Sequence, residues 1–226
     1  MQATPIIRHT KGAVLRRPEL FHGKPVIAFD TEDSRRNFLR GAALIGVGGT
    51  LAITRAGDRF ALAQDASQND LDILNYALTL EYLEAAFYTR ALENNVVEGR
   101  ELELVTPIRD HEQAHVAAVS GTISDLGGEP VERPRFRFPD GVLDNRDAFL
   151  ETASVFEELG VTAYQGQVTN IENGDILAAA AAIAGVESRH AAIIAQISGG
   201  NPFPATMEAT ATMDEVLEAA MQFIRS

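Results

Sequence analysis

The two halves of the chain repeat one set of polar residues, and this repeat restricts the possible folds more than any other feature. In each half a glutamate is followed at the seventh position by a tyrosine, and 30 or 31 positions later by Glu-x-x-His. The repeated residues are Glu81, Tyr88, Glu112 and His115, and then Glu157, Tyr164, Glu187 and His190. The first Glu and Tyr recur at an offset of 76 (157 minus 81), and the second Glu and His at an offset of 75 (187 minus 112). Agreement across three residue types indicates two copies of one unit that share a role.

Apolar residues recur at helical spacing around all of these positions. The pattern predicts helices over residues 70–94, 106–126, 147–172 and 175–197. Thr106-Pro107 predicts the start of the second helix, and Asp175 the cap of the fourth. A short helical pattern follows from Met213. No stretch shows sustained two-residue alternation, so no sheet is expected.

The connection lengths predict the topology. The first and third connections are short, which is typical of antiparallel helical hairpins. The middle connection, about residues 127–146, contains three prolines and is long enough to run the length of a bundle. The expected fold is all-α: a four-helix bundle over residues 64–200, built from two hairpins and a long crossover, with a short helical tail over residues 201–226.

The spacing of the repeated acids and histidines predicts a metal site. Residues three apart lie on one helix face, so the Glu and His of each Glu-x-x-His pair can reach one ion. The acids also stand where apolar residues are expected, and a buried carboxylate without a partner or a cation costs several kcal/mol. The predicted ligands are Glu81, Glu112, His115, Glu157, Glu187 and His190. Four carboxylates and two neutral imidazoles balance two divalent ions in charge.

Acids outside the repeat are interpreted as solvated. Glu84 and Glu158 lie beside the predicted ligands but have no counterpart in the other half. At the offset of the repeat, the position that corresponds to Glu84 is occupied by Gly160. Single acids on a helix usually face water, so neither glutamate is predicted to bind metal.

Three further residues have both a structural and a functional interpretation. Tyr88 and Tyr164 are interpreted as core aromatics, with a redox role or a role supporting the ligands as the less favoured alternative. His111 is interpreted as a surface histidine, with a supporting role beside the ligands as its alternative.

The segment over residues 1–63 has the features of an export signal. It holds ten basic and five acidic residues, whereas the remainder holds 27 acids, nine arginines and no lysine. Ser34-Arg35-Arg36-Asn37-Phe38-Leu39 precedes an uncharged run over residues 41–53 and then Ala61-Leu62-Ala63. This order resembles a twin-arginine signal and predicts a periplasmic or extracellular protein. The apolar run is too short for a stable membrane span. The alternative is a basic linker before a buried helix.

Composition excludes several classes of function. The chain has no cysteine, so thiolate metal sites, iron–sulfur clusters and disulfides are excluded. Its net charge of −13 disfavours binding to nucleic acid, which is largely cationic recognition. Arg133, Arg135 and Arg137 alternate with Phe136 and Phe138, and we expect this segment to pack on the bundle.

Four segments resemble the motifs of the ferritin-like domain. They are LEYLEAAFY (80–88), DHEQAH (110–115), FEELGVTAYQG (156–166) and VESRH (186–190). The resemblance covers residues 70–197 and is strongest to an exported group that includes plant desiccation-related proteins. It implies a di-iron or di-manganese carboxylate centre with the six ligands named above, iron being favoured. Activities in the superfamily include ferroxidase, peroxidase, catalase and oxygenase chemistry.

Three hypotheses for the function follow. The first is an exported di-metal protein that oxidises iron(II) or removes peroxide, with peroxide or dioxygen as its partner. The second is a non-catalytic protein that protects against desiccation or salt stress on the same fold. The third is a binding or assembly subunit that uses the tail or the crossover, and a homo-oligomer is compatible with each. The substrate and the catalytic residues are not predicted.

Overall fold

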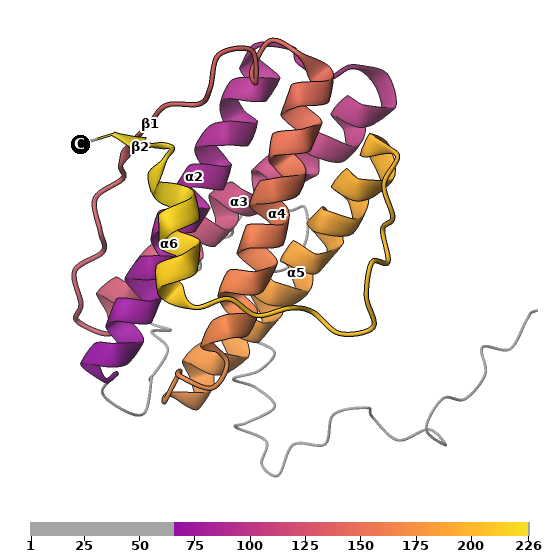
Figure 1. The fold of residues 1–226 in the computed structure, drawn as a ribbon. Coiled ribbons are helices and arrows are strands. Elements are labelled where there is room, and N and C mark those ends of the chain that lie inside the picture. The colour runs from indigo at the N-terminus through magenta and orange to yellow at the C-terminus, as the bar shows by residue number, and fades with distance from the viewer. Residues whose placement is uncertain (1–65, 226) are drawn as a thin grey trace, which may run out of the picture. The chain divides into compact units, whose positions relative to one another are not determined.

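Four long helices lie side by side in the computed structural model, which describes residues 66–225 (Figure 1). The predictions for the N-terminal signal fall outside these residues. The elements are α2 (Gln68–Glu93), α3 (Gly99–Asp125), β1 (Arg135–Phe136), α4 (Arg146–Gln167), α5 (Gly174–Ser198), α6 (Met213–Met221) and β2 (Ile224–Arg225). Helix α2 packs against α3, and α4 packs against α5. The two hairpins contact each other through α2 and α4 and through α3 and α5.

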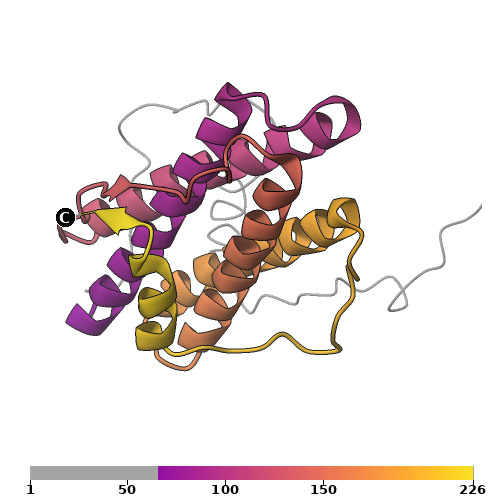
Figure 2. The same cartoon turned by 45° about the horizontal axis from the view of Figure 1, so that its top comes forward.

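The segment between α3 and α4 runs along the bundle from one end to the other (Figure 1 and Figure 2). The all-α fold of two hairpins joined by a long crossover is therefore confirmed. Helix α5 ends at Ser198, within one residue of the predicted end, and its C-cap is Gly199, whose φ of 80° is the left-handed conformation that glycine favours.

The predicted start of α3 is wrong, because the helix begins at Gly99 and Pro107 lies inside it. Thr106 does not cap a helix, and its hydroxyl donates to the carbonyl of Leu102 at 2.7 Å. Proline at this position removes one backbone hydrogen bond. The first turns remain helical, and they place Val105 in the apolar core.

The connection between α4 and α5 also differs from the prediction. Helix α4 ends at Gln167, and Asn173 caps α5 in place of Asp175. The carboxylate of Asp70 accepts hydrogen bonds from the backbone nitrogens of Glu172 (2.9 Å) and Asn173 (3.0 Å). These bonds hold the connection against α2 in a non-helical conformation.

Two short strands correct the expectation that the chain has no sheet. Strands β1 and β2 pair antiparallel, with Arg135 opposite Arg225 and Phe136 opposite Ile224. Each strand has two residues, too few to produce an alternating pattern. Phe136 and Phe138 are buried, so the crossover packs on the bundle as predicted.

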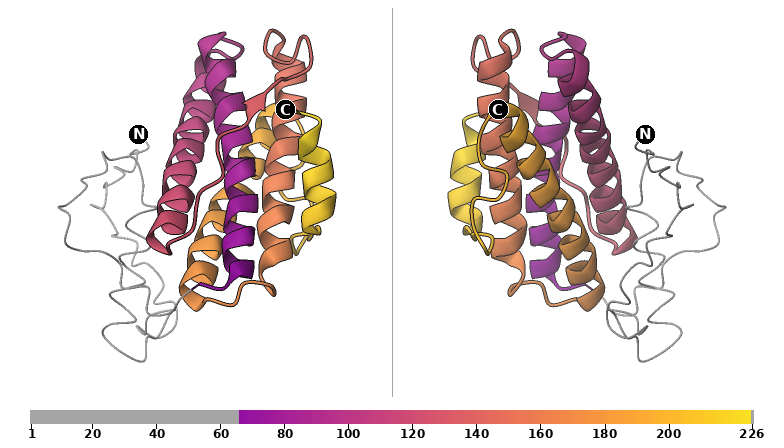
Figure 3. Two further views of the ribbon diagram at one scale, coloured as in Figure 1. Left: turned by 90° about the vertical axis from the view of Figure 1, so that its left-hand side faces the viewer. Right: turned by 90° about the vertical axis from the view of Figure 1, so that its right-hand side faces the viewer.

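The C-terminal segment crosses the bundle before α6 (Figure 3). The backbone nitrogen of Ala211 donates to the carbonyl of Thr162 on α4 at 3.2 Å. Gly166 permits this approach, because a Cβ there would lie 1.9 Å from the carbonyl oxygen of Ala211. The predicted helix from Met213 is present as α6, which starts with a capping box between Thr212 and Glu215.

Two apolar clusters fill the bundle, one on each side of a polar layer. The first cluster contains most of the aromatic side chains, among them Phe87, Phe149 and Phe156. The second contains mainly aliphatic residues, such as Leu78 and Ile123. On each of the four long helices, the predicted metal ligands lie between residues of the two clusters.

One helix in the described part of the chain, α5, is long and apolar enough to cross a membrane by length and composition. It packs against α4 and supplies Glu187 and His190 to the bundle interior. Within the described residues, 33% of its apolar stretch is buried.

Candidate metal centre

The structure brings all six predicted ligands together in the polar layer, one or two from each long helix. Helices α2 and α4 supply one glutamate each, and α3 and α5 supply one Glu-x-x-His pair each. Every one of the six residues is exposed by 4% or less. The i, i+3 spacing that suggested a common face therefore does direct each pair into the bundle.

The first group of donor atoms surrounds the ring of His115. Its Nδ1 atom lies 3.3 Å from Glu81 Oε2, 3.4 Å from Glu112 Oε2 and 3.0 Å from Glu187 Oε1. One donor atom from each of these four residues lies within 4.8 Å of every other. The group thus offers three carboxylate oxygens and one imidazole nitrogen to a single cation.

The second group surrounds His190 and repeats the first. His190 Nδ1 lies 2.9 Å from Glu112 Oε1, 3.5 Å from Glu157 Oε2 and 3.6 Å from Glu187 Oε2. Glu112 and Glu187 contribute one oxygen to each group. These two carboxylates are therefore shared between the two groups of donor atoms.

The donor atoms lie within ion-pair distance of one another but make no hydrogen bond within the described part of the chain. Eight buried atoms of these residues make no hydrogen bond: Glu81 Oε2, both carboxylate oxygens of Glu112 and of Glu187, Glu157 Oε2, and Nδ1 of His115 and His190. Buried polar atoms in proteins are almost always hydrogen-bonded. Atoms that converge without bonding to one another are suited to a cation between them, so the residues present fit a two-metal site.

Two tyrosines donate hydrogen bonds to Glu157 and Glu81, the two glutamates that each belong to one donor group only. The hydroxyl of Tyr88 on α2 donates to Glu157 Oε1 on α4. In the reciprocal contact, the hydroxyl of Tyr164 on α4 donates to Glu81 Oε1 on α2. The interpretation of these tyrosines as core aromatics is therefore incomplete, because each also fixes a predicted ligand from the opposite hairpin.

The interpretation of His111 as a surface histidine is wrong. The ring is only partly exposed, and its Nδ1 lies 2.8 Å from Nε2 of His190. Because the Nδ1 atom of His190 faces the centre, His111 contacts the opposite edge of that ring. A histidine ligand commonly has such a partner, which fixes its orientation.

The interpretation of Glu84 as solvated is also wrong. Its side chain is 4% exposed and lies in the polar layer. The sequence did contain a signal, because Glu84 is three residues after Glu81 and four before Tyr88, on the same helix face. Glu158, the other acid interpreted as solvated, is exposed as predicted.

Without a bound cation, burial and neighbouring charges shift the pKa values of the predicted ligands. Burial, together with the charge of Glu187, raises the pKa of Glu112 to about 8. Burial disfavours a charged imidazole, but the surrounding carboxylates outweigh it and raise the pKa of His190 to about 12. Burial likewise opposes ionisation of Glu187, but His115 and His190 lower its pKa to about 2. The carboxylates and imidazoles of the cluster thus favour each other's charged forms, whereas burial opposes them.

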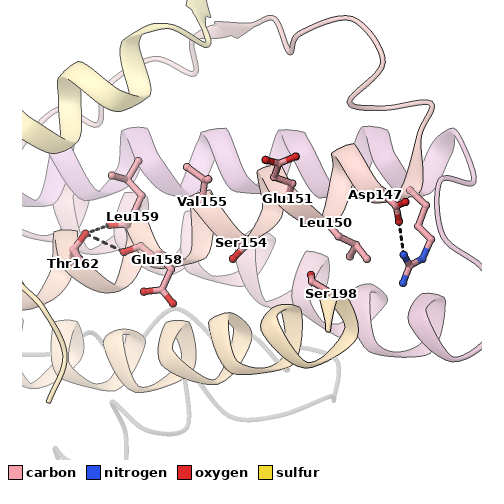
Figure 4. Close-up of a pocket in the computed structure, with 10 residues that line it drawn as sticks. Asp147, Leu150, Glu151, Ser154, Val155, Glu158, Leu159, Thr162 and Ser198 are labelled. Atoms are coloured by element: carbon pink, nitrogen blue, oxygen red, sulfur yellow. Dashed lines mark hydrogen bonds and ion pairs between the residues drawn. The ribbon is translucent and has the colours of Figure 1, made fainter. Parts of the chain in front are cut away.

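A groove of about 860 Å³ lies on the surface of the bundle, along α4 (Figure 4). Leu150, Val155 and Leu159 form its apolar part, and Asp147 and Glu151 are among its acidic residues. None of the described residues that line it belongs to the polar layer. The groove is therefore separate from the candidate metal centre.

Comparisons with known proteins agree with this fold. The profile of a family described as a ferritin-like domain matches residues 69–200, more than half of the chain. A hypothetical protein from Methanococcus jannaschii has a similar solved structure, with a TM-score of 0.50 and 15% sequence identity. The match covers 72% of this chain and 97% of that one. At this identity the likeness concerns the fold alone. A comparison with curated proteins finds no match.

Proposed function

Because this chain belongs to the ferritin-like domain family, we propose that it holds two divalent metal ions and carries out redox chemistry with them. The observation that carries the proposal is the set of eight buried, unbonded donor atoms that divides into two groups with two shared carboxylates. A single cation would leave one of the two groups without charge compensation. Two divalent ions neutralise the four carboxylates of these groups.

The donor set assigns a role to each ligand. Glu81 and His115 would hold one ion, Glu157 and His190 would hold the other, and Glu112 and Glu187 would bridge them. Oxygen and imidazole donors suit iron and manganese, whereas copper(I) prefers sulfur. We propose iron as the preferred metal, with manganese as the alternative.

Bound iron or manganese ions would exchange electrons with an oxygen species such as dioxygen or peroxide. The chain itself keeps the ligands in place and limits access of water. The hydroxyls of Tyr88 and Tyr164 each engage one oxygen of a terminal carboxylate, which leaves the other oxygen for the ion. His111 contacts Nε2 of His190 and so favours the ring orientation that presents Nδ1 to the centre. The apolar clusters on both sides of the polar layer restrict solvent.

We propose that the substrate is iron(II) or peroxide. Protein purified after growth with added iron should contain about two metal ions per chain by elemental analysis, as the two donor groups require. The same preparation should accelerate oxidation of iron(II) or consumption of hydrogen peroxide, and a preparation stripped by a chelator should not.

Absence of bound metal from protein grown with iron or with manganese would contradict the proposal. Two bound ions without turnover of either substrate would contradict its catalytic half and favour a structural or protective role. The exposed variant Glu158→Gln is a suitable reference, because it changes one carboxylate on α4 without touching the polar layer.

We also propose export by the twin-arginine route, on the basis of Arg35-Arg36 and the apolar and small residues that follow. Replacing both arginines by lysine should leave the precursor in the cytoplasm, because this route reads the arginine pair. Cell fractionation with an antibody to the bundle measures the distribution. Unchanged export of the double variant would contradict this route.

A further inference from the structure

Glu84 is a buried carboxylate that the six-ligand centre does not use. It lies on α2 between Glu81 and Tyr88 and is 4% exposed. No hydrogen bond or ion pair joins it to another described residue. Its oxygens are not among the fully enclosed, unbonded atoms of the centre, yet a carboxylate with so little access to water is still favoured by a neighbouring cation.

The space that Glu84 occupies is left by a glycine on the opposite hairpin. A Cβ built on Gly160 of α4 would lie 3.2 Å from Glu84 Oε1 and 3.7 Å from Glu84 Oε2. The same Cβ would lie 3.5 Å from Oε2 of Glu187, one of the two shared carboxylates. Glu84 therefore reaches across from α2 to α4 and ends beside the centre.

Gly160 is otherwise unfavourable at its position. Glycine in the interior of a helix is less stable than alanine, and Gly160 is in the interior of α4. It also stands at the position that corresponds to Glu84 in the repeat, at the same offset that relates Glu81 to Glu157. The chain thus places a long acid on one side of the layer and no side chain on the other.

The negative charges of the centre surround Glu84. Glu112, Glu187, Glu157 and Glu81 all act electrostatically on its carboxylate. A cation held among these four glutamates would therefore attract Glu84 as well.

We propose that Glu84 is a further ligand of the metal centre, a fifth carboxylate that binds from the side where Gly160 leaves room. This inference rests on the two-metal site proposed above. Five carboxylates carry one more negative charge than two divalent ions neutralise. One divalent and one trivalent ion would neutralise all five carboxylates, so the centre favours this pair over two divalent ions.

The test is the affinity for manganese(II), measured by competition with a chelator. Glu84→Gln keeps the shape of the side chain and removes its charge. Loss of a partner that merely supports a ligand costs about 10–100-fold in metal affinity, so we expect a loss of at least about tenfold. Glu158→Gln, the same change on the surface of α4, should bind as the wild type does.

A second pair of variants moves Glu84 without removing its charge. Gly160→Ala places a methyl group against the Glu84 carboxylate, whereas Gly121→Ala on α3 adds one where no atom lies within 4 Å. Both variants gain the helix preference of alanine. We expect Gly160→Ala alone to weaken manganese binding.

The outcomes separate this proposal from the previous one. Wild-type protein that binds no metal would contradict the two-metal centre itself. Wild-type protein that binds two ions, with Glu84→Gln binding them equally tightly, would overturn the role of Glu84 alone. Thermal unfolding of the metal-free proteins provides the second readout. A lower midpoint for Glu84→Gln with unchanged metal affinity would identify a structural side chain and also overturn the proposal.

Discussion

Glu112→Ala is expected to remove metal from both halves of the centre. Glu112 Oε2 lies 3.4 Å from Nδ1 of His115, and its other oxygen lies 2.9 Å from Nδ1 of His190. The substitution takes one donor from each group, and we expect the affinity for both ions to fall by at least about 100-fold. Elemental analysis after gel filtration should then find less than one ion per chain. Glu81→Ala, which affects one group only, should retain one ion.

Glu103→Ala is the matched control on the same helix. Glu103 is exposed, and among the residues that the structure describes it pairs only with Arg100, a surface contact worth at most about 1 kcal/mol. It should retain the metal content of the wild type, and circular dichroism should show the same helix content for both variants. Equal metal loss in both variants, or two ions retained by Glu112→Ala, would argue against a shared carboxylate.

Removal of the metal should invert the dependence of stability on pH. In the metal-free protein, burial raises the pKa of Glu112 from 4.5 to about 8, and the carboxylates around His190 raise its pKa from 6.5 to about 12 despite burial. A raised pKa means that the folded state binds more protons than the unfolded state. Stability of the metal-free protein is therefore expected to fall as the pH rises from about 5 to 8, by about 1.4 kcal/mol per pH unit for each extra proton.

The metal-loaded protein should show the opposite trend. Protons compete with the ions for carboxylates and imidazoles, so stability should increase with pH over the same range. Glu187 does not disturb this comparison, because its pKa falls from 4.5 to about 2 and its effect is confined to lower pH. Bound ions at about 1,000 times their dissociation constant should add about 4 kcal/mol per site.

Denaturant midpoints of the two forms at several pH values provide the measurement. The metal-free form is prepared with a chelator and the loaded form with excess manganese(II). Parallel curves for the two forms would show that the cluster does not bind the ion. Curves that cross or diverge, with the loaded form more stable at pH 8, are the expected result.

The sequence predicted the fold and the six-residue set because both depend on local spacing and on repetition. The period of apolar residues defines α2 and α5 closely. Local signals failed where tertiary contacts prevailed. Thr106-Pro107 resembles a helix start, yet α3 begins two turns before it, in turns that include the buried Val105.

The residues missed by the sequence argument are those that the repeat does not contain. Glu84 faces Gly160 at the corresponding position of the other half, and the position that corresponds to His111 holds Val186. A search for repetition finds the residues that both halves need. It passes over residues that act in one half only, and for Glu84 the remaining signal was its place on the same helix face as Glu81 and Tyr88.

The pairing of Glu84 with Gly160 bears on how such a chain arose. Two identical copies of a single helical hairpin, assembled face to face, would supply every ligand of the repeated set. Such a dimer would also place two glutamates, or two glycines, at the positions where the chain now has one of each. Two glutamates would compete for one space, and two glycines would leave it empty. When both hairpins belong to one chain, the two positions can differ. An asymmetric set of ligands is therefore open to the single chain and not to a symmetric dimer of hairpins.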